Sequence, residues 1–156
     1  MDLKFTVSIR IAKPVHEVFE AVADPTKLSA YFTTGGAKGR LETGATVMWD
    51  FHDFPGAFPV EVIEVVPDQK IVLRWPAHEG QAEGRADEPY YNDCVFTFEP
   101  LDGNTRTLVS VSEGSWRETP AGLKGAFGNC FGWSQMVCAL KAWLEYGINL
   151  REGAFK

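Results

Sequence analysis

Long apolar runs, histidines, cysteines and positive charge are all scarce in this sequence, and each scarcity excludes a class of protein. No apolar run approaches the ~18 residues that a membrane-crossing helix needs. The 15 Lys and Arg residues are outnumbered by 21 Asp and Glu residues, which gives a net charge of −6. Neither phosphates nor anionic lipids are attracted to an acidic surface, so we expect no nucleic acid and no membrane among the partners.

The cysteines and histidines form no pattern that is typical of a metal site. Cys130 and Cys138 lie on one predicted helix, where a rise of ~1.5 Å per residue separates them by about 12 Å, too far for a disulfide. Cys94 has no neighbouring cysteine, and the three histidines are widely scattered. An unpaired set of cysteines is typical of a reducing compartment. We therefore expect no metal and no cofactor.

Length and composition predict a single domain that spans residues 1–156. The chain has 156 residues, of which 45% are apolar, and a chain of this size buries about 70% of its unfolded surface without disulfides or metals. The first residues alternate in polarity and lack the apolar block of a signal peptide. Together with the unpaired cysteines, this start predicts a soluble, cytoplasmic protein.

Hydrophobic periodicity predicts both strands and helices. Residues 3–11 alternate between apolar and polar, which is typical of a half-buried strand, and residues 14–23 have the spacing of an amphipathic helix. A second short helix is expected at about 26–32. Residues 35–113 contain alternating runs separated by tight turns, which predict an antiparallel meander.

The last third of the chain is predicted to be one long helix. Apolar residues recur on one face of this helix, and this stripe consists of Trp133, Val137, Leu140, Leu144 and Ile148. Gly147 is a candidate for the end of the helix. The arrangement that buries the stripe is a curved antiparallel sheet of six or seven strands wrapped around the helix, with two short helices after the first strand. The fold class is therefore α+β.

The order and spacing of several motifs resemble a known family. The sequence Arg10-Ile11-Ala12-Lys13-Pro14, followed by Val18-Phe19-Glu20-Ala21, Asp24-Pro25 and Leu28, is similar to the start of proteins homologous to the activator of the heat-shock-protein-90 ATPase. Trp75, the stretch 107–114, and Gly132-Trp133 followed by Leu140 and Leu144 are similar to later parts of these proteins. The family belongs to the START/Bet v 1-like (SRPBCC) superfamily of helix-grip proteins, and the resemblance covers nearly the whole chain.

The resemblance implies a cavity between the long helix and the concave sheet. In the superfamily this cavity holds apolar molecules, so the resemblance implies a small apolar or aromatic ligand. The family name adds a chaperone as a possible partner and a role in the stress response. We expect a monomer or a weak homodimer.

Aromatic residues, 13% of the chain, are the candidates for a cavity wall, because burial and edge-to-face contacts would bind a flat apolar ligand. The candidate lining residues are Trp49, Phe51, Trp75, Tyr91, Phe96, Phe98, Val111, Glu113, Cys130, Trp133 and Val137. The alternative is a filled core, since protein interiors are close-packed. The acidic stretch 76–92 is either a solvated loop or a cover over the cavity mouth, with Tyr90 and Tyr91 contacting ligand.

Catalytic residues are not predicted. His52, Glu113 and Tyr91 could each serve as a general acid or base, but none has a second partner at a diagnostic spacing. Three functions stay open: ligand binding without chemistry, a cyclase-like or hydrolase-like reaction, and stimulation of a chaperone ATPase by protein contact. The first is favoured, because aromatic residues are plentiful and no catalytic cluster is visible.

Four glycines, Gly122, Gly125, Gly128 and Gly132, precede or open the last helix. Each glycine inside a helix costs about 0.5–1 kcal/mol relative to alanine. One hypothesis is that the helix begins near Gly128 and that a loop precedes it. The other is that a weakened helix start acts as a gate that admits ligand.

Overall fold

A computed structural model describes residues 2–77 and 89–156, and these form one antiparallel sheet and three helices. The strands are β1 (Leu3–Ile11), β2 (Gly36–Lys38), β3 (Thr46–Phe51), β4 (Phe54–Val66), β5 (Lys70–Pro76), β6 (Tyr91–Leu101) and β7 (Arg106–Trp116). The helices are α1 (Val15–Ala23), α2 (Pro25–Ser29) and α3 (Pro120–Tyr146). This arrangement confirms the predicted α+β class and the order of elements.

The sheet is a meander to which the first strand is added at one edge. Its strand order is β1-β7-β6-β5-β4-β3-β2, and every pair is antiparallel. Short turns join β3 to β4, β4 to β5 and β6 to β7 as predicted, while α1 and α2 carry the chain from β1 at one edge to β2 at the other. The short strand β2 lies within a glycine-rich stretch, residues 35–39.

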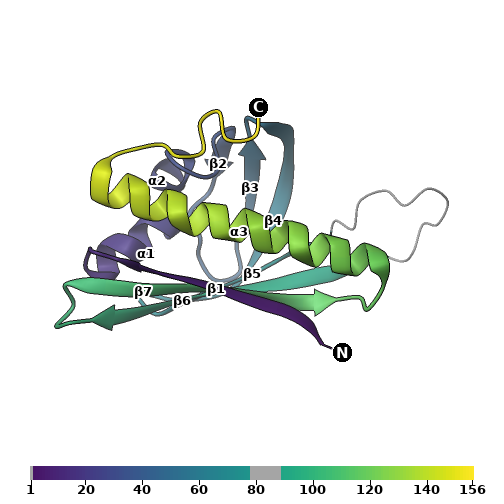
Figure 1. Cartoon of the computed structure of the whole chain (residues 1–156), viewed down its shortest axis with the longest axis horizontal. Helices are drawn as coiled ribbons and strands as arrows, with labels where there is room; N and C mark the ends of the chain where they lie inside the picture. The colour runs from purple at the N-terminus through teal and green to yellow at the C-terminus, as the bar shows by residue number, and fades with distance from the viewer. Residues whose placement is uncertain (1, 78–88) are drawn as a thin grey trace.

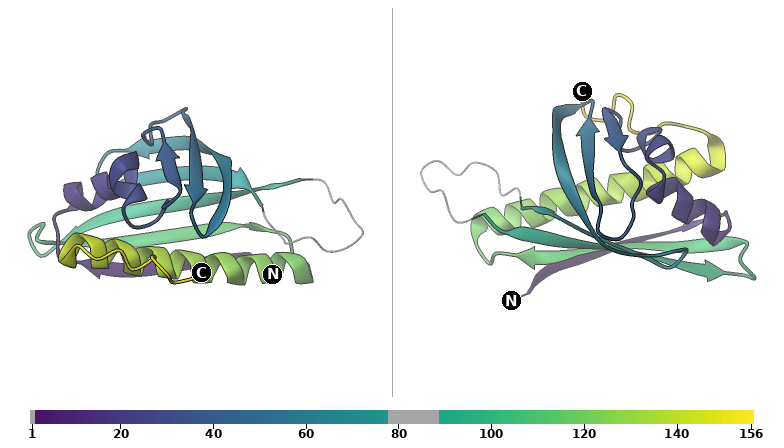
Figure 2. Two further views of the ribbon diagram at one scale, coloured as in Figure 1. Left: turned by 90° about the horizontal axis from the view of Figure 1, so that it is seen from above. Right: turned by 180° about the vertical axis from the view of Figure 1, so that it is seen from behind.

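The sheet bends around α3, and this bend makes room for a cavity. In Figures 1 and 2, β3 and β4 rise steeply from the direction of β1, β6 and β7, and α3 crosses the hollow face. The register shifts between Trp49 and Phe51 in β3 and between Val62 and Glu64 in β4. Such irregularities increase local twist and bend a strand, so they place the curvature at β3 and β4.

Alternation within the strands sets which side chains face α3. Most residues predicted to face inward on β3, β5, β6 and β7 are buried, including Trp49, Leu73, Phe96 and Val111, while Phe51 is partly buried. On α3 the predicted stripe is buried from Trp133 to Leu140. The period-2 and period-3.6 patterns therefore identified the two surfaces that meet in the core.

Helix α3 begins earlier than one hypothesis placed its start, and it ends before the last residue of the predicted apolar stripe. It begins at Pro120, where the Thr119 hydroxyl accepts a hydrogen bond from the Gly122 amide at 3.0 Å. The hypothesis of a start near Gly128 is therefore wrong, because this cap and a proline at the first helical position start the helix earlier. At the other end, Gly147 takes a left-handed conformation with φ of 67°. Ile148 thus lies beyond the helix and is 53% exposed, so it does not extend the stripe.

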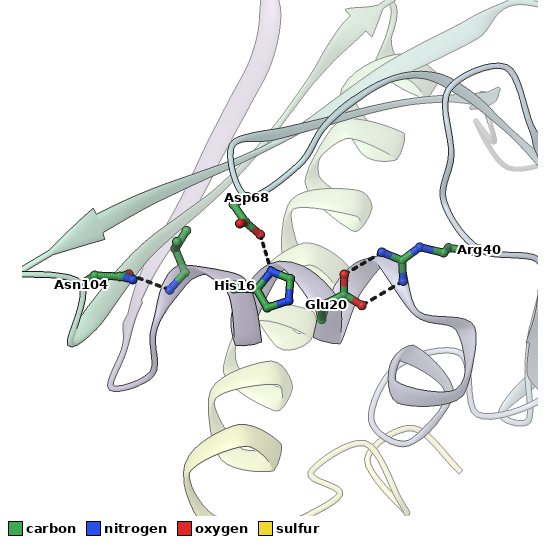
Figure 3. A network of polar contacts seen from close by, with 6 residues as sticks. His16, Glu20, Arg40, Asp68 and Asn104 are labelled. Atoms are coloured by element: carbon green, nitrogen blue, oxygen red, sulfur yellow. Dashed lines mark hydrogen bonds and ion pairs between the residues drawn. The ribbon is translucent and has the colours of Figure 1, made fainter.

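Polar contacts attach α1 to three distant turns (Figure 3). The Asn104 side chain accepts a hydrogen bond from the Val15 amide at 2.9 Å, and His16 Nδ1 lies 2.9 Å from Asp68 Oδ1. Glu20 accepts two hydrogen bonds from Arg40, and these bonds lower the pKa of the Glu20 carboxyl. The contacts fix α1 and α2 at one end of the sheet, where α2 leads into the cavity wall.

Two further searches concern only the described part of the chain. No helix there combines the length and the apolar character that crossing a bilayer requires. No three or more His, Cys, Asp or Glu side chains gather there in a way that would hold a metal ion.

The glycines of α3 differ in the space around them, and this difference predicts opposite effects of alanine. A Cβ atom on Gly125 would lie 2.5 Å from the buried Trp116 ring, whereas a Cβ on Gly128 would meet no atom within 4 Å. We expect Gly128→Ala to raise the free energy of unfolding by about 0.5–1 kcal/mol. Gly125→Ala should lower it by about 1–3 kcal/mol, because the ring must shift. Urea denaturation of both variants checks this, and equal effects would contradict the packing described.

Candidate ligand cavity

A cavity of about 700 Å³ lies between α3, the bent part of the sheet and the C-terminal segment 148–156. Its walls come from four parts of the chain: the segment after α2, the strands β3 to β5, the first half of α3 and the C-terminal segment. The lining residues are Phe32, Trp49, Phe51, Phe54, Gly56, Phe58, Trp75, Gly128, Asn129, Phe131, Gly132, Trp133, Arg151 and Phe155. The wall is therefore aromatic on nearly every side.

Trp133 lies where the aromatic rings of the wall converge. Its indole stacks on Trp75, with ring centroids 5.3 Å apart, and lies 5.6 Å from the Phe32 ring. Phe96 contacts it edge-on from the core side at 5.4 Å. Large flat rings held on several sides cannot easily rotate into the cavity, so the ring cluster keeps the space open.

Two glycines leave part of the α3 side of the cavity free of side chains. Gly128 and Gly132 lie four residues apart on one face of the helix and both line the cavity. A Cβ atom added to either one would meet no atom within 4 Å. Glycine is unfavourable inside a helix, but at these two positions it leaves backbone rather than a side chain facing the cavity.

A buried carboxylate holds Trp133 in place. Glu113 is only 1% exposed and accepts hydrogen bonds from the Trp133 indole nitrogen and the Asn129 amide nitrogen, both at 2.8 Å. Burial raises the pKa of the Glu113 carboxyl, and these hydrogen bonds oppose the rise. Glu113 does not itself line the cavity, so it acts on the site by orienting two residues that do.

Three phenylalanines surround the outer end of the cavity. Phe131 on α3 and Phe54 at the start of β4 are 65% and 54% exposed. Phe155 lies between them, with its ring centroid 6.1 Å from Phe131 and 5.8 Å from Phe54. The C-terminal segment therefore connects the helix side of this rim to the sheet side.

Four of the predicted lining residues, Trp49, Phe51, Trp75 and Trp133, do line the cavity. The structure places the other predicted residues outside its wall: Phe96, Phe98, Val111 and Val137 lie in the packed core, Glu113 is buried, Cys130 is partly buried, and Tyr91 is exposed on β6. The prediction that these residues line the cavity is wrong. Alternation shows which side chains point inward, but not which of them are covered by other side chains. The suggested cover at 76–92 falls largely on residues 78–88, outside the described residues.

Several lining residues were missed by sequence reasoning. Phe54 and Phe58 belong to an aromatic-rich turn and strand that the period-2 pattern does not mark as buried. Arg151 and Phe155 lie in the segment after the last helix, for which the sequence carries no periodic signal. The density of aromatic residues in 51–58 is the one local feature that points to this wall.

The cavity lacks a pair of groups suited to acid–base chemistry. Among its described lining residues, Arg151 is the one charged side chain. His52 and Tyr91 are exposed outside the wall, and Glu113 is occupied by two donors. The geometry is therefore suited to enclosing an apolar molecule rather than to proton transfer.

Replacing Glu113 tests its role as a support for Trp133. An amide in Glu113→Gln can accept from one of the two donors but presents N–H groups to the other, so we expect a loss of about 1–3 kcal/mol in the free energy of unfolding. The loss should depend on pH. Because burial raises the pKa of Glu113 above its ordinary value of 4.5, its contribution to stability is complete below that pH and decreases as the pH rises through the folded-state value.

The measurement is urea denaturation of the wild type and Glu113→Gln between pH 4 and 7. The variant does not titrate at this position, so its deficit should be largest at the acidic end and shrink toward neutrality. A deficit that stays constant over this range would contradict a raised pKa at Glu113.

Comparisons with solved structures show the same fold in other proteins. A protein from Staphylococcus saprophyticus superposes with a TM-score of 0.73 at 21% identity, covering 95% of this chain and 96% of its own. The Aha1 protein of Colwellia psychrerythraea, described as a dimer in solution, gives 0.71 at 20% identity, covering 92% and 97%. DynU16, described as a putative protein in the dynemicin biosynthetic locus, gives 0.75 at 26% identity and covers 97% of this chain, which spans half of DynU16.

Sequence comparison gives the family. No curated protein matches the chain, but the profile of a family described as "Activator of Hsp90 ATPase homolog 1-like protein" matches residues 12–145. Because this match spans most of the chain and the fold is that of solved helix-grip relatives, the protein belongs to the Activator of Hsp90 ATPase homolog 1-like family.

Proposed function

We propose that this protein binds a small apolar or aromatic molecule in the cavity between α3 and the sheet. The cavity of about 700 Å³ with a mostly aromatic wall is the observation that carries the proposal. Ligand sites of proteins are typically apolar and aromatic concavities of about 300–1,000 Å³ with a few polar groups. The volume and the lining of this cavity both meet that description.

The expected affinity follows from the apolar area that a ligand would bury. A two-ring or three-ring aromatic molecule that loses roughly 300–400 Å² of apolar surface gains about 8–10 kcal/mol. Loss of translational and rotational freedom offsets at least about 4 kcal/mol of this gain. The balance corresponds to dissociation constants in the micromolar range or weaker.

Binding without catalysis is the simplest use of this site. The lining offers rings, backbone and a single charged side chain, which suit shape recognition. The likeness to DynU16, from a biosynthetic locus, supports a small molecule as the ligand. We further propose a monomer or a weak homodimer, since the relative from Colwellia psychrerythraea is described as a dimer.

Filling the cavity from the helix side tests the proposal. Gly132→Leu would project a side chain into the open space beside Trp133, while Gly132→Ala adds only a methyl group that meets no atom. We expect the fluorescent probe N-phenyl-1-naphthylamine to bind the wild type and Gly132→Ala with affinities within about threefold of each other. Gly132→Leu should weaken binding at least tenfold, because the leucine occupies ligand space.

The measurement is probe fluorescence titrated with protein, with circular dichroism to show that each variant is folded. If the probe binds Gly132→Leu as tightly as the wild type, the probe does not occupy the cavity. If it fails to bind the wild type at all, the proposal of an aromatic ligand site is overturned.

A second candidate function is protein contact through the outer face of α3. Leu123 and Phe127 lie one turn apart on this helix and are both exposed, Phe127 to 68%. Contiguous exposed apolar side chains, rather than single ones, often mark interaction sites. The family description supports a heat-shock-protein-90 ATPase as the partner.

An ATPase assay tests this second candidate. If the candidate is right, the protein should raise ATP hydrolysis by the heat-shock-protein-90 chaperone of the same organism. Phe127→Ser should lower that stimulation several-fold, because a central aromatic contact is lost. The cavity-filling variant Gly132→Leu is the matched control and should stimulate like the wild type. Stimulation that is unchanged in Phe127→Ser would exclude this face.

A further inference from the structure

We propose that Arg151 is the specificity-determining residue of the cavity and that it selects aromatic ligands carrying an anionic oxygen, such as a carboxylate, sulfonate or phenolate. This inference rests on the proposed function, because it names the chemistry of the ligand that the cavity would take. It concerns a residue that lies beyond the last helix and that no periodic pattern in the sequence marks.

The C-terminal segment brings Arg151 to the cavity. After α3 ends at Tyr146, the left-handed Gly147 reverses the chain, and residues 148–156 return along the helix toward β3 and β4 (Figure 1). The Asn149 side chain accepts a hydrogen bond from the Arg151 amide at 3.1 Å. This return path makes Arg151 part of the wall, although its α-carbon lies outside every helix and strand.

Aromatic rings surround the guanidinium of Arg151. Its central carbon lies 4.7 Å from the Phe51 ring centroid, 5.0 Å from that of Phe155 and 5.5 Å from that of Phe32. The side chain is only 7% exposed. A cation among ring faces is stabilised without a full hydration shell, and a further hydrogen-bond partner approaches such a group in the plane of its nitrogens.

The two edges of the guanidinium are satisfied unequally. Nη2 lies 3.1 Å from Asp53 Oδ1 and 3.0 Å from Oδ2, and Nε lies 3.4 Å from Oδ1, so Asp53 occupies this edge. Among the described residues, Nη1 makes one hydrogen bond, a long one of 3.5 Å to Gln135 Oε1. Because a hydrogen bond of this length is weak, the N–H groups of Nη1 can still donate to a ligand.

Two further buried donors, one on a lining residue and one on a residue that contacts Arg151, also lack acceptors. Within the described residues, the indole nitrogen of Trp49 and Nε2 of Gln135 are buried without a hydrogen-bond partner. Trp49 is a lining residue like Arg151, and Gln135 contacts Arg151 directly. Buried donors without acceptors cost free energy, and a ligand that brings an oxygen acceptor to the lining residue Trp49 would relieve part of that cost.

The charge of the cavity wall predicts the charge of the ligand. Asp53 is not a lining residue, so the charged group that faces the cavity is the guanidinium. Hydrogen bonds from a cation to an anionic oxygen are shorter and stronger than neutral ones, and the surrounding rings keep out the water that would screen them. An aromatic acid would place its rings among Trp75, Trp133 and Phe51 and its acidic group at Nη1.

The contrasting explanation is that the Arg151–Asp53 ion pair serves only to hold the C-terminal segment on the sheet. The two explanations differ for Asp53→Asn. If the pair is only a tether, removing the carboxylate charge weakens the cavity wall for every ligand. If Arg151 selects anions, the same change removes a competitor for the guanidinium and increases the affinity for an anionic ligand alone.

A matched pair of fluorescent probes separates these cases. N-phenyl-1-naphthylamine and 1-anilinonaphthalene-8-sulfonate share the same ring system and differ by one sulfonate group. We expect the sulfonate probe to bind Asp53→Asn about tenfold more tightly than the wild type. It should bind the double variant Asp53→Asn/Arg151→Met about tenfold more weakly than the wild type. The neutral probe should change by less than about twofold in both.

Two controls accompany these titrations. Gly132→Leu should weaken both probes, which shows that both enter the cavity. Arg151→Lys keeps the charge but loses the planar nitrogen edge, so it should weaken the sulfonate probe several-fold and leave the neutral probe unchanged. If circular dichroism shows that the double variant is unfolded, Arg151→Lys takes its place in the test, because it keeps a cation beside Asp53.

The outcomes distinguish this inference from the proposed function. If neither probe binds the wild type, both are overturned. If the neutral probe binds and the sulfonate probe is insensitive to Asp53 and Arg151, the cavity remains a ligand site but Arg151 does not select the ligand. If the Asp53 and Arg151 variants weaken both probes equally, the ion pair is a tether and the selective role of Arg151 is overturned.

Discussion

The hydrogen bond from the Trp133 indole to the buried Glu113 carboxylate is the contact on which the cavity depends. It joins α3 to β7 at 2.8 Å and fixes the ring against which Trp75, Phe32 and Phe96 pack. A carboxylate this deeply buried is costly unless its oxygens are satisfied, and the Asn129 amide provides the second donor. The polar pair therefore adds a directional contact to the ring packing that surrounds the indole.

The space beside Trp133 exists because two features of the chain oppose close packing there. The sheet side supplies rigid rings, and the helix side supplies Gly128 and Gly132, which have no side chain to reach across. Elsewhere along α3, Met136, Val137 and Leu140 fill the gap to the sheet. One helix thus forms a packed core with its second half and a cavity wall with its first half, and the change from glycine to larger residues divides the two.

The C-terminal segment gives this apolar space a polar end. Arg151 and Phe155 both come from residues after α3, and they meet β3 and β4 across the cavity. Aromatic rings provide affinity for flat molecules in general, whereas a cation held among them discriminates between such molecules.

The sequence by itself determined the elements, their order and their inward faces. Alternation in residues 3–11 and 35–113 and the apolar stripe that begins at Trp133 predicted the sheet, the long helix and the α+β class, because burial imposes a period of two on strands and of 3.6 on helices. It also identified Trp49, Phe51, Trp75 and Trp133 as wall residues. Tertiary structure alone decided which inward residues face empty space, and Phe96 and Val111 proved to lie in the core. It also brought Arg151 to the site, because a segment without periodicity is placed by its contacts with distant residues and not by its own pattern.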